Sequence, residues 1–247
     1  MRWLVLFAAL AMPVVAWLSQ MEVFGPDQAT VSARYPIVLV PAGYAFSIWG
    51  LVFVLDLAHA VRQATGRRRH DPLLARVAPA TAAGFALTAL WMPLYAQEWL
   101  WACLAVIVGA WATLLWTAIA LARGGGDGWA RLALSLHAGW LTLATFLNLA
   151  QAGLGAGLLP GGEQLGWSLG LLALAAAVLL AANRALRGDA AYAAAAIWGL
   201  AAIHVEQSRG ALAGAGTVAW AAAALAALVA AQTLWLRLRT RRAGPRA

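Results

Sequence analysis

The chain has 247 residues, of which 64% are hydrophobic and only 11% are charged. Soluble domains carry roughly 25% charged residues, so this composition excludes an ordinary soluble globular protein. The net charge of +8 comes from arginine alone, because the sequence contains no lysine. A basic chain can bind nucleic acid, but these arginines fall at the ends of long apolar runs. We therefore expect the lipid bilayer, and not nucleic acid, as the partner.

Eight apolar runs have a length and composition that predict membrane-spanning helices. They cover approximately residues 3–21, 40–61, 73–95, 99–122, 129–151, 165–186, 190–204 and 211–236. The first and the seventh are short, so seven spans are the alternative. The sequence predicts an all-α, polytopic membrane bundle of about eight transmembrane helices.

The arginines are distributed unevenly across this topology. All but two of the 17 fall on one side of an eight-span arrangement, and only Arg34 and Arg209 fall on the other. Arginine-rich loops usually face the cytoplasm, so both termini are expected there, in a bacterial cytoplasmic membrane. The alternative for residues 1–20 is a cleaved signal peptide, because Arg2 precedes an apolar stretch.

The second span opens with the stretch VPAGYAFSIWGLVF, residues 40–53. Proline is tolerated in a first helical turn, so we expect a helix from Pro41. Trp49, Phe53 and Asp56 then share one face. Trp49 lies too deep for an interfacial anchor, which favours a cavity wall, whereas for Tyr44 anchoring is an equal alternative. The preceding loop, 22–39, is predicted to be an irregular lid over the outer mouth.

Asp56 and His59 stand one turn apart within the same span. Ionisable groups in a membrane helix are costly, and they are functional hypotheses by default. A proton relay through Asp56 and His59 is one hypothesis. The other is local pairing near the cytoplasmic end, in which Asp56 contacts Arg62 or His59.

The third and fifth spans carry further aromatic and polar residues. In LTALWMPLY, residues 87–95, Thr88 and Trp91 stand close to Pro93, which removes a helical hydrogen bond. In the fifth span, one stripe at helical spacing must face protein or a cavity, and interhelical hydrogen bonding is the alternative. The stripe consists of His137, Trp140, Ala144, Asn148 and Gln151.

No catalytic constellation, phosphate loop or metal pair occurs in the sequence. We predict no enzymatic activity, no metal site and no required cofactor. Tryptophans inside the spans favour a flat, largely apolar ligand. Haem is one such ligand by its chemistry, and His137 is a weak candidate for its axial ligand. His137, Thr145 and Asn148 could offer hydrogen bonds to it.

Three segments resemble motifs of the TspO/translocator family, the tryptophan-rich sensory proteins. They are VPAGYAFSIWGLVF, LTALWMPLY and GWLTLATFLN, in the order of the family's second, third and fifth helices. Val40, Thr88 and His137 depart from the family pattern. The resemblance covers residues 1–153, the length of a five-helix family member, and three further spans follow it.

The resemblance implies a five-helix bundle whose pocket opens toward the first loop and binds porphyrins or sterol-like molecules. It also implies positions for the aromatic residues, with Tyr44 and Phe46 near the mouth. The implied lining residues are Trp49, Trp91, Trp140, Ala144 and Asn148. We accordingly predict a ligand-binding unit over 1–153 and an Ala/Leu-rich unit with a basic tail over 154–247.

Three functions follow as hypotheses. The first is a sensory or regulatory membrane protein that binds a tetrapyrrole or a sterol-like lipid. The second is a proton-coupled transporter or channel for a small solute, and the third is a structural protein that docks another membrane protein. A homodimer is left open beside the single chain.

Overall fold

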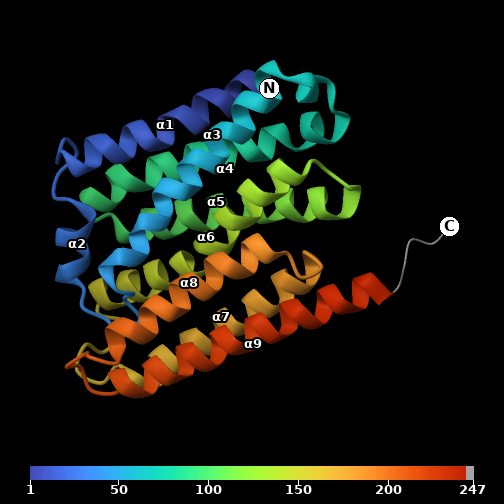
Figure 1. The fold of residues 1–247 in the computed structure, drawn as a ribbon. Helices are drawn as coiled ribbons and strands as arrows, with labels where there is room; N and C mark the ends of the chain where they lie inside the picture. The colour runs from blue at the N-terminus through green and yellow to red at the C-terminus, as the bar shows by residue number, and fades with distance from the viewer. Residues whose placement is uncertain (243–247) are drawn as a thin grey trace.

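The computed structural model describes residues 1–242, in which helices are joined by turns and loops (Figure 1). The long helices are α1 (Arg2–Gln20), α3 (Ile48–Thr65), α4 (Pro72–Ala96), α5 (Leu100–Gly124), α6 (Gly128–Gly155), α7 (Leu165–Ala185), α8 (Ala190–Gln207) and α9 (Ala215–Arg242). Shorter elements are α2 (Gln28–Arg34) and the 3-10 helices η1 (Gly43–Ser47) and η2 (Arg67–His70). The predicted all-α bundle is confirmed.

Seven of the long helices are long and apolar enough to cross a membrane. The exception, α8, carries His204, Glu206 and Gln207 in its last turns, which lower its hydropathy. Its length of about 27 Å nevertheless approaches the thickness of a bilayer core. It lies alongside α6 and α9 across the bundle (Figure 1). The fold is therefore a polytopic membrane bundle.

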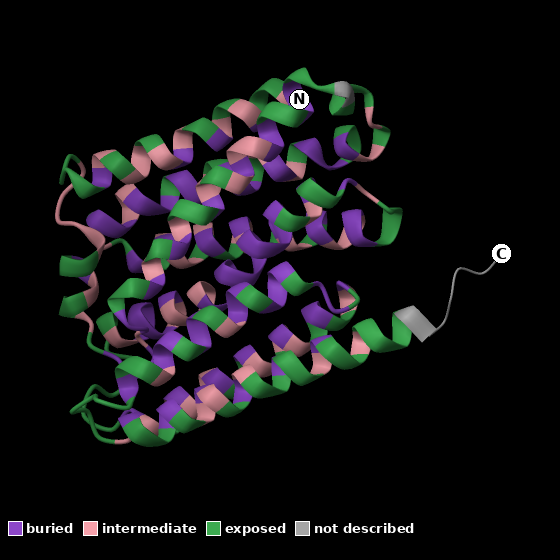
Figure 2. Cartoon of the chain, in the orientation of Figure 1, coloured by how far each residue is buried: buried purple, intermediate pink, exposed green. Residues whose placement is uncertain are grey.

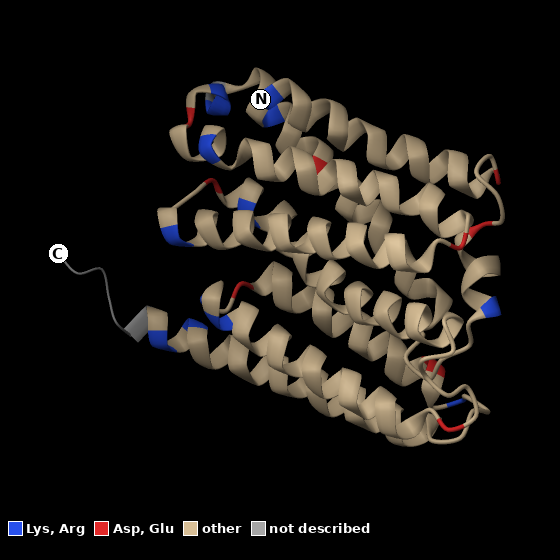
Figure 3. Cartoon of the chain, turned by 180° about the vertical axis from the view of Figure 1, so that it is seen from behind, with Lys and Arg blue, Asp and Glu red and all other residues tan. Residues whose placement is uncertain are grey.

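Arginine residues gather at one end of the bundle, which Figure 3 shows from behind. We call this the arginine-rich end, and the N-terminus and the end of α9 lie toward it (Figure 1). The opposite end, here the acidic end, carries Glu22, Glu98 and the lid segment 22–39. The charge asymmetry expected from the sequence is thus present in three dimensions.

The outward faces of the helices are apolar and exposed. Figure 2 shows exposed residues along α1 and α9 and buried residues toward the middle of the bundle. Large side chains such as Phe7, Leu90 and Trp220 lie on these faces. In water such a surface would drive aggregation, so it is a surface suited to acyl chains.

Four helices begin at an aspartate, a residue favoured as an N-cap because its carboxylate accepts free backbone N–H groups. Asp71 accepts from Leu73 and Leu74 at the start of α4, at 2.9 and 3.2 Å. Asp27 accepts from Thr30 at the start of α2, and this bonding lowers the pKa of the Asp27 carboxyl. Asp127 and Asp189 cap α6 and α8 in the same way.

Two local expectations were wrong. The span predicted from residue 40 is 3-10 over Gly43–Ser47 and becomes α-helical only at Ile48. The lid segment 22–39 is not wholly irregular, because the Asp27 cap starts α2. Pro93 lies inside α4, which continues to Ala96.

Helix α6 is the centre of the bundle and packs against α3, α5, α7 and α8. Its approach to α8 depends on Gly139, where a Cβ atom would lie 2.4 Å from the carbonyl oxygen of Tyr192. A backbone atom cannot move aside as a flexible side chain can. The two halves of the chain can therefore meet this closely only with glycine at position 139.

We predict that Gly139→Ala lowers the free energy of unfolding by about 1–3 kcal/mol through overpacking. Gly170→Ala in α7 is the matched control, since a Cβ there has nothing within 4 Å, and it should be neutral or stabilising. Thermal unfolding in detergent measures both. Equal effects of the two changes would contradict the close-packing account.

Candidate ligand cavity

The backbone between the lid and α3 is extended or 3-10 and not α-helical, so some of its polar groups need other partners. Three of them are supplied by α8. The amide of Ala42 donates to the carbonyl of Ala202 at 3.0 Å. The indole Nε1 of Trp198 donates to the carbonyl of Ala45 at 3.0 Å, and Gln207 Nε2 donates to the carbonyl of Val40 at 2.8 Å. Side chains far along the sequence thus fix the stretch around Pro41.

The lid segment is fastened on two sides. On one side, Gln164 accepts from the amide of Val38 at 3.0 Å and donates to the carbonyl of Pro36 at 2.9 Å. On the other, Glu98 pairs with Arg34 and accepts from the Tyr35 hydroxyl at 2.8 Å. The bond to Glu98 raises the pKa of Tyr35. These contacts hold α2 across the acidic end.

Beneath the lid lies a narrow apolar cavity, which we call the inner slot. About 50 Å³ of it can be reached by the centre of a water molecule, enough for a few waters. Its walls come from the lid, η1, α3, α4, α5, α6, α7 and α8. They include Gln28, Ser32, Phe46, Trp49, Trp91, Tyr95, Trp140, Leu143, Ala144, Asn148, Gln151, Leu172, Gly199 and Ile203.

Two larger hollows share Gln28 and Phe46 with the inner slot. The side chamber extends toward α1 and is reached by water centres over about 240 Å³; it also includes Phe53. The outer vestibule lies between the lid and the end of α8, over about 590 Å³. The three hollows thus lie next to one another around Gln28 and Phe46, beside the lid.

One wall of the inner slot is a hydrogen-bonded set from α4 and α6. The indole Nε1 of Trp91 donates to Asn148 Oδ1 at 2.8 Å, and Asn148 Nδ2 donates to the carbonyl of Ala144 at 2.8 Å. One turn further out, the Tyr95 hydroxyl donates to Gln151 at 3.0 Å. The side chains of Asn148 and Gln151 thus make their hydrogen bonds within the protein. The wall that they form with Trp91 and Tyr95 therefore presents a largely apolar surface to the slot.

The facing wall is aromatic. Trp49 meets Trp140 edge to face at 6.2 Å between ring centroids, and Phe46 meets Trp140 in the same way at 6.0 Å. The Nε1 atom of Trp140 is buried and has no acceptor among the described residues. Since an unmade hydrogen bond to a buried donor costs about 1–3 kcal/mol, this N–H group is ready for an acceptor.

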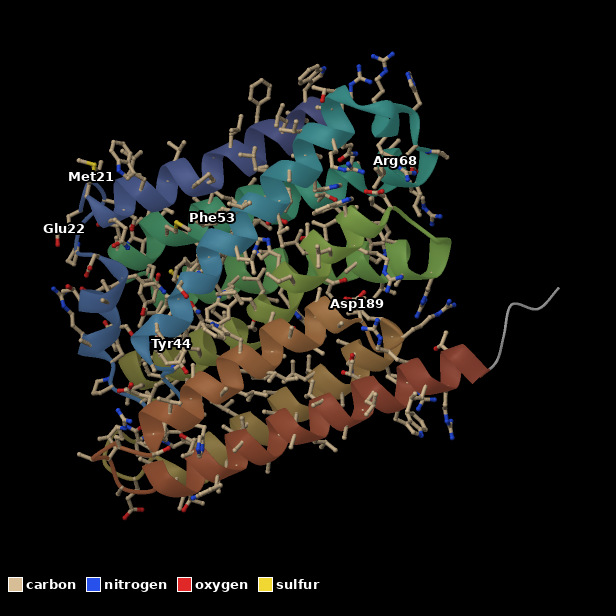
Figure 4. All side chains as sticks on the ribbon, viewed as in Figure 1. Met21, Glu22, Tyr44, Phe53, Arg68 and Asp189 are labelled. Atoms are coloured by element: carbon tan, nitrogen blue, oxygen red, sulfur yellow. The ribbon has the colours of Figure 1, made fainter. Side chains whose placement is uncertain are left out.

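The structure brings together six of the residues singled out from the sequence. Phe46, Trp49, Trp91, Trp140, Ala144 and Asn148 all line the inner slot. Phe53 lies in the side chamber and stacks on Trp49 at 5.5 Å. Figure 4 labels Phe53 on α3 and Tyr44 nearer the acidic end of the same stretch.

Four of the singled-out residues lie outside the three hollows. Tyr44 is exposed and packs edge-on against Trp198 at 5.3 Å. Thr145 donates to the carbonyl of Leu141 at 2.9 Å within α6. Thr88 donates to the carbonyl of Gly84 at 2.9 Å. His137 lies below Trp49, with which its ring makes an edge contact at 5.7 Å.

Asp56 and His137 form a fully buried pair between α3 and α6. The Asp56 Oδ2 atom lies 2.7 Å from His137 Nδ1, and His137 Nε2 lies 3.4 Å from the Thr88 hydroxyl. The expected pairing of Asp56 with Arg62 or His59 was wrong, because the helix places the carboxylate toward α6. Asp56 Oδ1 and His59 Nε2 are buried without partners among the described residues.

Several lining residues were missed by sequence reasoning. Tyr95 ends the LTALWMPLY motif, and its spacing of four from Trp91 could have indicated it. Leu143, Leu172, Gly199 and Ile203 carry no signal, since apolar and small residues abound in every span. The inner slot therefore draws on residues from both sides of position 153. The domain division at that position stays a prediction.

A helical membrane bundle with a tryptophan-lined cavity beneath the lid segment defines the class of protein. A family model described as "TSPO-like protein" matches residues 2–235. The chain therefore belongs to the TSPO-like protein family and is an integral membrane protein. No curated protein and no solved structure matches the chain. The match extends over both expected units and confirms the resemblance noted in the sequence.

We predict a strong coupling between Asp56 and His137. Asp56→Ala should lower the free energy of unfolding by about 3–5 kcal/mol, because it leaves a buried partner uncompensated. Removing both polar groups in Asp56→Leu/His137→Phe should recover much of that loss. Denaturation of the unmodified chain, Asp56→Leu, His137→Phe and the double variant forms a complete cycle. Additive effects would contradict direct pairing.

Proposed function

We propose that the protein binds a flat, largely apolar molecule, such as a porphyrin or a sterol-like lipid, between its tryptophans in a sensory or regulatory role. One observation carries this proposal: the rings of Trp49, Trp91 and Trp140 line one narrow apolar slot, and the buried Trp140 Nε1 beside it has no acceptor among the described residues. A ligand that fits must therefore bring an acceptor oxygen, as a carboxylate, a carbonyl or a hydroxyl, as well as a flat apolar body.

The size of the hollows suggests how such a ligand is seated. Ligand sites usually enclose roughly 300–1,000 Å³, and the inner slot is far narrower than that. The outer vestibule and the side chamber provide the remaining room. The proposal is that one edge of the ligand enters the slot, that the Phe46 and Trp49 rings move apart, and that the body stays under the lid.

The orientation in the membrane is part of the proposal. The arginines gather at the end toward which the N-terminus and the end of α9 lie. The positive-inside rule assigns that end to the cytoplasm, which in a bacterial cytoplasmic membrane turns the lid outward. Ligand would then enter from the outer side or from the outer leaflet.

The binding proposal is tested with protoporphyrin, using quenching of tryptophan fluorescence in the detergent-solubilised full-length chain. Trp140→Phe keeps an aromatic ring but removes the N–H donor, so we expect about tenfold weaker binding. Trp49→Ala should weaken binding at least as much, because it removes a ring from the slot wall.

Trp220→Phe is the matched control, since Trp220 is 72% exposed on α9, outside the three hollows. Its affinity should equal that of the unmodified chain. Wild-type affinity in both Trp140→Phe and Trp49→Ala, with folding intact by thermal unfolding, would overturn the proposed site.

A second candidate function is proton-coupled movement of a small solute, and the buried Asp56–His137 pair favours it. Ionisable groups at this depth are characteristic of proton pathways. His59 lies one helical turn from Asp56 toward the arginine-rich end, and its buried Nε2 atom has no hydrogen-bond partner among the described residues. The hypothesis is that Asp56 and His59 exchange protons with that end while His137 contacts Trp49 in the slot wall.

This second candidate predicts pH-dependent solute flux in proteoliposomes that Asp56→Asn abolishes. Asp71→Asn is the control, since Asp71 lies in a loop and caps α4. Flux without pH dependence, or flux unchanged in Asp56→Asn, would rule out the relay and leave ligand binding unaffected.

A further inference from the structure

A separate hollow lies at the arginine-rich end, at the opposite end of the bundle from the lid. It is bounded by the α5–α6 turn, the start of α6, the α7–α8 turn and the end of α9, and about 520 Å³ can be reached by water centres. Three arginines line it: Arg131, Arg187 and Arg237. Gly128 also lines it, and a Cβ there would meet nothing within 4 Å. We call it the basic groove.

The charge within the basic groove is unbalanced. Asp189 is its one acidic lining residue, and its Oδ2 atom accepts from Arg131 Nη2 at 2.7 Å. The other oxygen of Asp189 accepts the amides of Ala191 and Tyr192 at the start of α8. Asp189 is thus fully engaged, and Figure 4 labels it at this position.

Arg187 and Arg237 make no ion pair with any described acidic side chain. Arg131 adds a buried Nε atom that has no acceptor among the described residues. The groove therefore offers two unneutralised guanidinium groups and one unused, buried donor. Guanidinium groups bind phosphate oxygens well, because their N–H donors form a planar fork.

The arginines come from three elements that are held together tightly. Arg187 has a left-handed backbone (φ +59°), and Gly188 follows at φ +72°. A Cβ on Gly188 would lie 2.9 Å from the carbonyl oxygen of Thr233 on α9. This contact fixes the α7–α8 turn on α9 close to Arg237. The spacing of the cations is consequently built into the fold and does not depend on mobile loops.

We propose that the basic groove binds a phosphate group, and that the headgroup of an anionic phospholipid supplies it. The groove lies at the end of the membrane-spanning helices, at the level where headgroups meet the protein. Basic pockets between transmembrane helices at the cytoplasmic side bind anionic headgroups. Leu132 and the exposed Trp235 nearby provide apolar and interfacial surface for the glycerol and acyl region.

The site joins α6 to the α7–α8 turn and to α9, which belong to different parts of the chain. A bound headgroup would neutralise Arg187 and Arg237, which have no ion-pair partner among the described acidic side chains. Binding should therefore stabilise the folded bundle in proportion to lipid concentration. This proposal does not rest on the proposed ligand of the inner slot.

The experiment uses the full-length chain in neutral detergent and native mass spectrometry with added phosphatidylglycerol. Arg187→Gln and Arg237→Gln should each reduce affinity about fivefold, and Arg237→Lys should retain most of it. Arg184→Gln is the matched control: it removes the same charge from the same end, three residues from Arg187, but Arg184 does not line the groove.

Further measurements distinguish the phosphate group of a lipid from free inorganic phosphate as the bound group. Competition of millimolar inorganic phosphate with lipid would support the phosphate site and show that free phosphate also occupies it. Failure of phosphate to compete, with arginine-dependent lipid binding, would assign the site to lipid alone. Equal binding of phosphatidylcholine, or an equal loss in Arg184→Gln and Arg187→Gln, would overturn the proposal. Thermal unfolding of each variant identifies any loss that comes from misfolding.

Discussion

The structure depends on how the irregular backbone around Pro41 is satisfied. A chain in a membrane cannot leave peptide groups unpaired in apolar surroundings, and it tolerates irregular backbone only where protein covers it. Here the partners are a carbonyl of α8 and the side chains of Trp198 and Gln207. Gln164 does the same for the lid at Pro36 and Val38. The later helices are thus required for the conformation of the earlier segment.

This constraint also creates the inner slot. Because η1 is held against α8, Phe46 and Trp49 face Trp140 on the central helix α6. Gly139 and Gly199 allow α6 and α8 to approach closely behind these rings. The slot is consequently a product of the lid, η1 and helices α3 to α8, and the buried Trp140 Nε1 in its wall has no acceptor among the described residues. Rigid placement of a single polar group is how apolar cavities gain specificity.

Much of the fold could be predicted from the sequence, because each apolar run ends at a charged or glycine-rich turn. The convergence of Trp49, Trp91 and Trp140 on one slot was implied by the resemblance of their three motifs to the TspO/translocator family. The partner of Asp56 was not, since His137 lies 81 residues away and nothing local indicates their contact. Gln164 and Gln207 gave no signal either, because a lone glutamine near a helix end has no distinctive pattern. The 3-10 start at Gly43 depends on those same distant partners.

The central claim is that the tryptophan-lined slot between α3, α6 and α8 holds a flat ligand. Photo-crosslinking with a diazirine-bearing tetrapyrrole, followed by peptide mapping, tests it most directly. We predict adducts on slot residues from both parts of the chain, such as Leu143 on α6 and Ile203 on α8, and their loss when unlabelled protoporphyrin competes. Adducts confined to lipid-facing residues such as Phe7, Leu90 and Trp220, and insensitive to competitor, would contradict the account.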